Sequence, residues 1–116
     1  MEQLNRIELR GTVGGVRLQN YNELTVAHFT LVTNYAYKDK EGTPVIESTW
    51  HNVTAWEGKD IPDLSSIDKG TKLYVIGRLR TQKYTGADGV DRVSTEVVAR
   101  RIVVIEEDQQ LQCEMS

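Results

Sequence analysis

Several residue types that support chemistry are scarce in this chain of 116 residues. It contains one cysteine, two histidines and two prolines. Cys113 therefore cannot form an internal disulfide, and a reducing, cytoplasmic setting is expected. Without a cluster of His, Cys, Asp and Glu, the sequence offers neither a metal site nor a nucleophile–base pair. We therefore predict that the protein is not an enzyme and uses no metal or cofactor.

Long apolar segments are also absent. No run approaches the roughly 20 residues that cross a membrane as a helix, and the first ten residues, MEQLNRIELR, lack the apolar stretch of a signal peptide. Hydrophobic residues make up 39% of the chain and charged residues 27%, which is typical of a globular domain. We expect one folded domain over residues 1–105, no membrane partner, and a short acidic, disordered tail over residues 106–116.

The charge is unevenly distributed along the chain. The net charge of −3 argues against a uniformly basic nucleic-acid binder. Residues 72–101, however, hold seven Lys/Arg against three Asp/Glu, a net charge of +4, whereas residues 102–116 hold four acidic residues and no basic one. The sequence therefore contains a local basic segment followed by an acidic end.

Alternation of apolar and polar residues predicts β-strands in the first part of the chain. Apolar or small residues fill every second position from Ile7 to Val13, and Gly14-Gly15 then favours a bulge or a sharp bend. A turn at residues 20–22 leads to a second strand over residues 23–34, followed by a flexible hairpin loop over residues 35–42. The side chains expected to be buried on the second strand are Ala27, Phe29 and Leu31.

The third predicted strand, over residues 45–56, carries both tryptophans of the chain. Trp50 and Trp56 are six residues apart and therefore point to the same side of a strand. If Val53 and Ala55 face the core, both rings lie on the open face, where large apolar side chains usually mark a partner surface. The alternative is a strand that is buried on both sides, with both tryptophans in the core.

The segment from residue 69 to residue 98 predicts two strands with a turn at Asp88-Gly89, the strands covering residues 71–83 and 92–105. Leu73, Val75, Gly77 and Leu79 alternate on what we expect to be the core face. The other face mixes cations with aromatic rings and holds Lys72, Tyr74, Ile76, Arg78, Arg80, Gln82 and Tyr84. Such a face can bind a nucleic-acid strand, with phosphates on the cations and bases on the rings, or it can be an ordinary solvated face.

The predicted order is three strands, a connection with one or two helical turns at residues 57–68, and two more strands. This all-β order predicts the OB-fold, a five-stranded Greek-key barrel with a short helical segment between strands three and four. Barrels of this kind bind oligonucleotides or oligosaccharides, and the cations between the aromatics favour the former.

Five segments, in this order, resemble the bacterial single-stranded DNA-binding proteins of the SSB family. They are Leu4–Gly11 (LNRIELRG), Phe29–Thr33 (FTLVT), Thr49–Val53 (TWHNV), Lys69–Tyr84 with its VIGRLRTQKY ending, and Gly89–Val98 with its STEVV ending. The resemblance implies sequence-tolerant binding and protection of single-stranded DNA during replication, recombination and repair, in the cytoplasm and near the nucleoid.

The resemblance also implies roles for individual residues. It implies base stacking by Trp50, Trp56, Tyr84 and Tyr37, phosphate contacts by Arg78, Arg80, Lys83, Lys72 and Lys38, and a place for His51 at a subunit interface. Members of the family assemble as homotetramers, or as dimers with two folds per chain, so the resemblance together with one fold per chain implies a homotetramer, with a dimer as the alternative.

The sequence departs from the family at its end. Only about eleven residues follow Ile105, and the acidic, hydrophobic tip that recruits replication and repair enzymes is not recognisable. A second interpretation is a primosomal replication accessory protein, which keeps the barrel but acts as a dimeric interaction module. A third is a module of the same fold that binds carbohydrate or protein.

Overall fold

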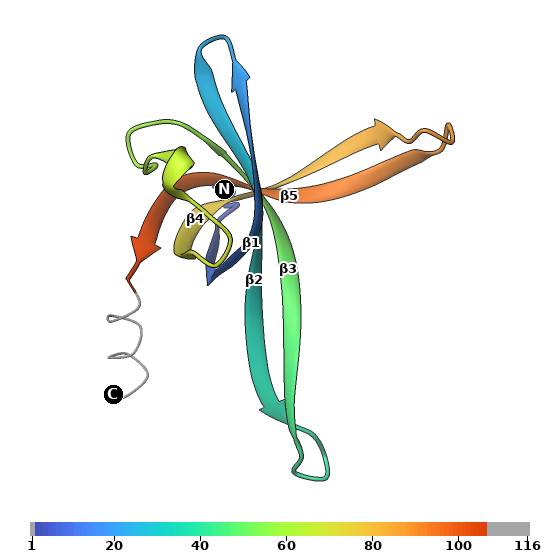
Figure 1. The fold of residues 1–116 in the computed structure, drawn as a ribbon. Helices are drawn as coiled ribbons and strands as arrows, with labels where there is room; N and C mark the ends of the chain where they lie inside the picture. The colour runs from blue at the N-terminus through green and yellow to red at the C-terminus, as the bar shows by residue number, and fades with distance from the viewer. Residues whose placement is uncertain (1, 107–116) are drawn as a thin grey trace.

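Five long strands form almost all of the computed structural model, which describes residues 2–106 (Figure 1). The strands are β1 (Ile7–Tyr21), β2 (Leu24–Lys38), β3 (Pro44–Trp56), β4 (Lys72–Thr85) and β5 (Asp91–Ile105). They close into a barrel in the order β1-β2-β3-β5-β4, with β3 and β5 parallel and every other pair antiparallel. A 3₁₀ helix, η1 (Leu64–Ser66), lies between β3 and β4. The predicted five-stranded OB-fold is confirmed.

The strands are longer than the barrel, so their ends extend beyond it as hairpins. Figure 1 shows the β1–β2, β2–β3 and β4–β5 hairpins leaving the centre in three directions. Each hairpin is a two-stranded ribbon whose faces lack the cover that the barrel gives its inner face. Exposed apolar residues such as Leu18, Tyr35 and Val93 lie on these ribbons.

The core is the inner face of the barrel. Strand residues alternate sides, so every second residue of a barrel strand points inward. The predicted buried side chains Ala27, Phe29 and Leu31 of β2 are at most 3% exposed. From the other strands and the η1 segment, the core adds Val13, Val53, Ala55, Leu64, Ile67, Leu73, Val75, Val97 and Ile102.

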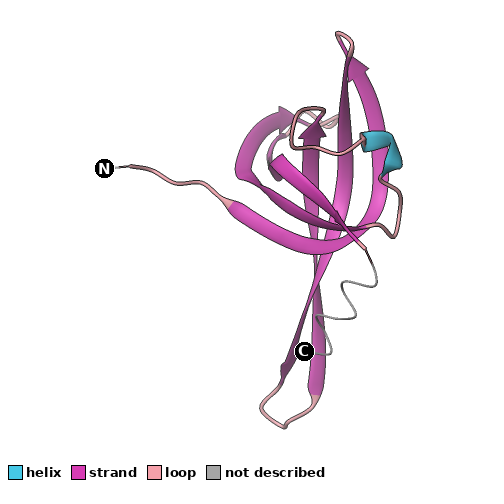
Figure 2. Ribbon diagram, turned by 90° about the vertical axis from the view of Figure 1, so that its left-hand side faces the viewer, coloured by secondary structure: helices cyan, strands magenta, loops and turns pink. Residues whose placement is uncertain are grey.

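The predicted helical connection covers one end of the barrel (Figure 2). Leu64 of η1 and the adjacent Ile67 are buried against the core. The carboxylate of Asp63 caps η1 by accepting hydrogen bonds from the hydroxyl and the amide of Ser65. These bonds favour the charged form, so they hold the pKa of Asp63 below its ordinary value. Leu64 and Ile67 thus close this end of the barrel, and the Asp63 cap fixes the residue at which η1 begins.

Two expected boundaries in the first hairpins are wrong. β1 continues through Gly14-Gly15 to Tyr21, because Gly14 is accommodated as the predicted bulge: the register shifts between Val13 and Gly15 without breaking the pairing. The turn lies at residues 22–23 rather than 20–22. Residues 35–38, expected in a loop, extend β2 and pair with β3.

Leu79 was expected in the core but is 44% exposed. Its position lies an even number of residues from the inward-facing Leu73 and Val75, so it is on the same face of β4 as they are. At this point, however, β4 and β5 are leaving the barrel as a hairpin, so less of the molecule covers their inner face (Figure 1). The side-chain amide of Asn5 makes two hydrogen bonds to the backbone of Leu79 and holds the N-terminal segment beside it.

The turn between β1 and β2 generates a stability prediction. Asn22 and Glu23 both have positive φ, at 48° and 70°, as in two-residue hairpin turns that favour Asn-Gly. Because glycine adopts this conformation without a steric penalty, Glu23→Gly should raise the free energy of unfolding by up to about 1 kcal/mol. Gly42, at φ 82° in the next hairpin, is the matched control: Gly42→Ala should lower it by about 1 kcal/mol. Urea unfolding at one protein concentration measures both, and a loss of stability in Glu23→Gly would contradict the prediction.

Candidate nucleic-acid interface

The outer face of β3 carries four side chains in a row: Trp50, Asn52, Thr54 and Trp56. They alternate with Val53 and Ala55, which are at most 1% exposed on the inner face. The ring-bearing residues are 60% and 43% exposed, so the two tryptophans lie on the open side of the strand. At about 3.4 Å per residue they are about 20 Å apart along β3, enough for several bases between them.

Trp50 lies across the β1 bulge. A methyl group added at Gly14 would come within 2.4 Å of the Trp50 ring and 2.8 Å of the Thr30 hydroxyl. The absence of a side chain at Gly14 therefore leaves the room that the indole occupies. Of the glycine pair noted in the sequence, Gly14 thus makes room for this ring as well as for the bulge, whereas a side chain at Gly15 would meet nothing within 4 Å.

Trp56 lies at the other end of the row beside a residue that the sequence analysis missed. The ring centroids of Trp56 and Tyr21 are 5.9 Å apart, and both rings are more than 40% exposed. Tyr21 was placed in a connecting turn, and only the extension of β1 brings it next to β3. The signal that could have found it is the apolar–polar alternation continuing past the bulge.

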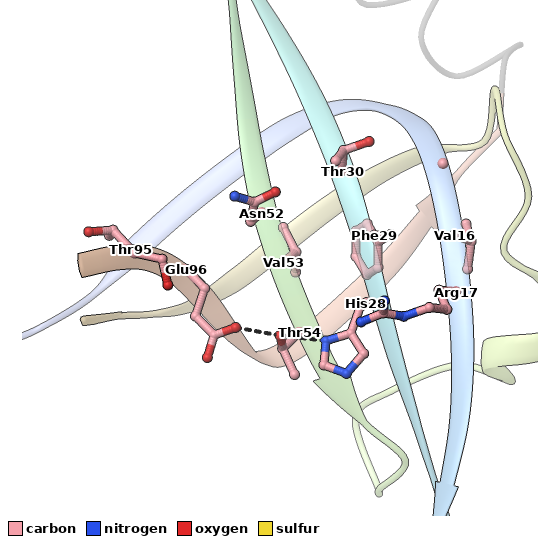
Figure 3. Close-up of a pocket in the computed structure, with 12 residues that line it drawn as sticks. Val16, Arg17, His28, Phe29, Thr30, Asn52, Val53, Thr54, Thr95 and Glu96 are labelled. Atoms are coloured by element: carbon pink, nitrogen blue, oxygen red, sulfur yellow. Dashed lines mark hydrogen bonds between the residues drawn. The ribbon is translucent and has the colours of Figure 1, made fainter. Parts of the chain in front are cut away.

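Between the two tryptophans the surface is hollowed into a groove of about 510 Å³, which we call the outer groove (Figure 3). It crosses β1, β2 and β3 and is bounded by β5. Its charged and polar side chains include Arg17, His28, Thr30, Asn52, Thr54 and Glu96. Small and hydrogen-bonding groups thus form the floor between two exposed rings, which suits the edges of flat polar ligands.

A chain of hydrogen bonds runs across the outer groove (Figure 3). His28 Nδ1 lies 3.2 Å from the Thr54 hydroxyl, which donates to Glu96 Oε2 at 2.7 Å. Glu96 Oε1 accepts from the side-chain amide of Gln82 at 3.1 Å and lies 3.6 Å from a guanidinium nitrogen of Arg80. Glu96 therefore brings one negative charge into the groove and holds the Arg80 guanidinium beside its carboxylate through an ion pair.

The β4–β5 ribbon separates the predicted cations. Arg78, Arg80 and Tyr84 pair with Val98, Glu96 and Arg92, on the ribbon face that is continuous with the outer groove. Lys83 pairs with Val93 on the opposite face. Among residues 2–106, Arg78 has no ion-pair partner, whereas Arg80 is paired with Glu96. Of the two arginines on the groove side, Arg78 is therefore the more available to a phosphate.

The remaining predicted contact residues are spread over other parts of the molecule. Tyr37 and Lys38 lie near the end of the β2–β3 hairpin, where Tyr37 stacks with Tyr35 at a centroid distance of 6.0 Å. Tyr37 points to the face opposite Trp50, because the two positions differ in strand parity. Lys72 begins β4 and pairs with Thr12 of β1, two strands away from β3. Tyr37, Lys38 and Lys72 therefore do not lie beside the two tryptophans.

Tyr74 belongs to another wall of the barrel. Its hydroxyl donates to the carboxylate of Glu8, and the guanidinium of Arg10 lies 5.8 Å from its ring centroid. The bond to Glu8 raises the pKa of Tyr74 above its ordinary value, because it holds the phenol proton. Cations and aromatic rings alternate here too, but the Tyr74 ring and the Arg10 guanidinium interact with each other across β1 and β4.

His51 is half-buried on the inner side of β3, where the β2–β3 hairpin leaves the barrel. Its Nε2 lies 2.9 Å from the hydroxyl of Thr33 on β2. Within the part of the chain that the structure describes, no three His, Cys, Asp or Glu side chains gather as a metal site requires. Over residues 2–106, no helix is long and apolar enough to cross a membrane. The predicted tail, apart from Glu106, lies outside the described residues.

Known proteins are similar to this chain in sequence and in fold. Single-stranded DNA-binding proteins from Xanthomonas campestris pv. campestris and Neisseria meningitidis serogroup A are 32% and 28% identical over 106 residues. These matches cover 88% of the chain and 60% of each relative, so the chain spans about three fifths of the length of the curated relatives it matches.

Two solved structures are similar in fold. The Plasmodium falciparum SSB in complex with ssDNA has a TM-score of 0.78 and 24% identity, covering 91% of this chain and 98% of that one. A deletion mutant of the single-stranded DNA binding protein from Thermus aquaticus has a TM-score of 0.72 and 23% identity, covering 90% and 51%. The model of the single-strand binding protein family matches residues 4–105, which include all five strands of the barrel and their hairpins. The chain therefore belongs to the single-strand binding protein family.

Proposed function

We propose that this protein binds and protects single-stranded DNA with little dependence on sequence. The observation that carries the proposal is the exposed row on β3, where Trp50 and Trp56 bracket a polar groove on the outer face of the barrel. The names of the curated relatives support the same ligand. The chain works by binding rather than by catalysis.

Stacking supplies the selectivity for single strands. An unpaired base can lie flat on an exposed indole, whereas the faces of duplex bases are already covered by their neighbours. Such contacts are worth about 1–3 kcal/mol per base and tolerate any sequence, because every base has a π-face. Trp50, Trp56 and Tyr84 are the stacking residues in this proposal.

Phosphates bind the cations beside these rings. Of the two arginines on the groove side, Arg78 is the leading contact, because it has no acidic partner among the described residues whereas Arg80 shares its charge with Glu96. Neutralised phosphates release condensed counterions, so binding weakens with added salt. Lys38 and Tyr37 on one hairpin, Lys83 on another, and Lys72 on β4 contribute where a long strand bends around the molecule.

A homotetramer is the proposed assembly, with His51 near a subunit interface. Several copies would let one DNA strand occupy several grooves, which raises affinity without new contacts. The alternative is a dimeric primosomal accessory protein, which the names of the relatives favour less. We place the protein in the bacterial cytoplasm, acting in replication, recombination and repair.

The two tryptophans allow each stacking contact to be tested separately. Trp50→Phe and Trp56→Phe each leave one indole in the chain. In both variants oligo(dT) should quench the remaining fluorescence, because a base covers the ring, and a duplex of equal length should not. Trp50→Ala should weaken oligo(dT) binding by about 1–3 kcal/mol with an unchanged circular dichroism spectrum. Fluorescence that stays constant on saturation with oligo(dT) would exclude stacking at that position.

The phosphate contacts are tested by salt dependence. For single strands the slope of log K against log salt is about −0.7 per neutralised phosphate. Arg78→Ala should therefore make the slope less steep by about 0.7. Lys69→Ala, which removes an exposed cation in the connection before β4, should leave it unchanged. Equal slopes for Arg78→Ala and the wild type would remove Arg78 from the interface.

Light scattering tests the assembly. A homotetramer has four times the 13.2 kDa mass of the chain, and its complex with oligo(dT) should have that mass plus the mass of the bound DNA. A mass of two chains would favour the dimeric accessory protein over the proposed assembly.

A further inference from the structure

The floor of the outer groove carries hydrogen-bonding side chains, which a surface that only stacks bases does not need. We propose that it is a base-edge site that favours cytosine and adenine over thymine, and that Glu96 binds their exocyclic amino group. The inference rests on the proposed function, since it concerns how one part of the same surface discriminates between bases.

The direction of the hydrogen bonds across the groove shows which groups remain open. The Thr54 hydroxyl has one hydrogen and donates it to Glu96 at 2.7 Å. It must therefore accept from His28, so the neutral ring carries its hydrogen on Nδ1, 3.2 Å away. In that tautomer Nε2 of His28 is an acceptor. His28 and Glu96 thus both offer acceptors in the lining of one groove.

Glu96 has acceptor capacity beyond the partners it already binds. Its two oxygens can accept about four hydrogen bonds. Oε2 takes the Thr54 hydroxyl, while Oε1 takes the Gln82 amide and faces Arg80 at 3.6 Å. The side chain is 19% exposed and is held in place from both sides, so its free lone pair has a fixed position in the groove wall.

The same carboxylate disfavours a phosphate on the β5 side of the groove, which Glu96 lines. Like charges repel, and Arg80 is already paired with Glu96, while Arg17 lines the groove on its β1 side. Arg17 and Arg78 lie at the two ends of a row of paired outward-facing residues that crosses the barrel through Thr54. A bound strand therefore places its backbone toward these ends and turns its bases over the groove, between Trp50 and Trp56.

Acceptors select bases that present donors. Cytosine N4 and adenine N6 are amino donors, whereas thymine presents the acceptor O4 at the corresponding position. An amino group would satisfy the free lone pair of Glu96, and a carbonyl oxygen would face it unfavourably. One net hydrogen bond corresponds to roughly a threefold to tenfold difference in affinity.

The test compares oligo(dC) with oligo(dT) of one length on the full chain at one salt concentration. Glu96→Gln keeps the shape, removes the charge and lets an amide hydrogen meet O4 of thymine. The ratio Kd(dT)/Kd(dC) should fall by roughly threefold to tenfold in Glu96→Gln. Asp68→Asn removes one negative charge in the connection before β4, outside the groove, and should leave the ratio at its wild-type value.

Thr54→Val is the second variant, since it removes only the hydroxyl that holds Glu96 Oε2, and it should lower the ratio in the same direction. Circular dichroism checks that each variant is folded. Equal changes in both affinities in Glu96→Gln would assign Glu96 to electrostatics or to the orientation of Arg80, and would overturn the base-edge site while leaving the proposed function intact. If the wild type bound neither oligonucleotide, the proposed function itself would fail.

Discussion

Closure of five strands into a small barrel is the constraint on which the rest of this structure depends. A closed barrel has one interior, so each strand must send alternate side chains inward and the others to solvent. Val53 and Ala55 fill the interior of β3, which leaves no place inside for the tryptophans on either side of them. The exposed rings are thus a direct consequence of packing the core.

The candidate interface balances charge rather than accumulating it. Glu96 lies among groups that would otherwise make the groove basic, and it ties up Arg80 while Arg78 stays unpaired among the described residues. A surface of this kind holds nucleotides through stacking and hydrogen bonds at its centre and through phosphate contacts at its margins. This arrangement suits a chain whose overall charge is negative.

Period-two alternation made most of the fold and part of the site predictable. It located all five strands and the buried set of β2, and it placed Trp50 and Trp56 on the same side of β3 without deciding whether that side is open or buried. It was less informative at the hairpins: Leu79 fits the inward pattern but lies where β4 and β5 leave the barrel, and β1 continues past its bulge. Alternation reports which face a residue is on, whereas burial also depends on what covers that face.

The sequence by itself determined the strands, their faces and the residue types available on the open side. Only the tertiary structure decided which of those residues meet. Trp50 lies over Gly14, Tyr21 beside Trp56, and Glu96 between Thr54 and Arg80, although each pair is distant in the chain. Contacts between residues so far apart in the chain depend on the register between strands and on the bulges that shift it. Register follows from the turns and from which faces of two strands are buried together, so it is fixed only when strands distant in the chain pair in the closed barrel.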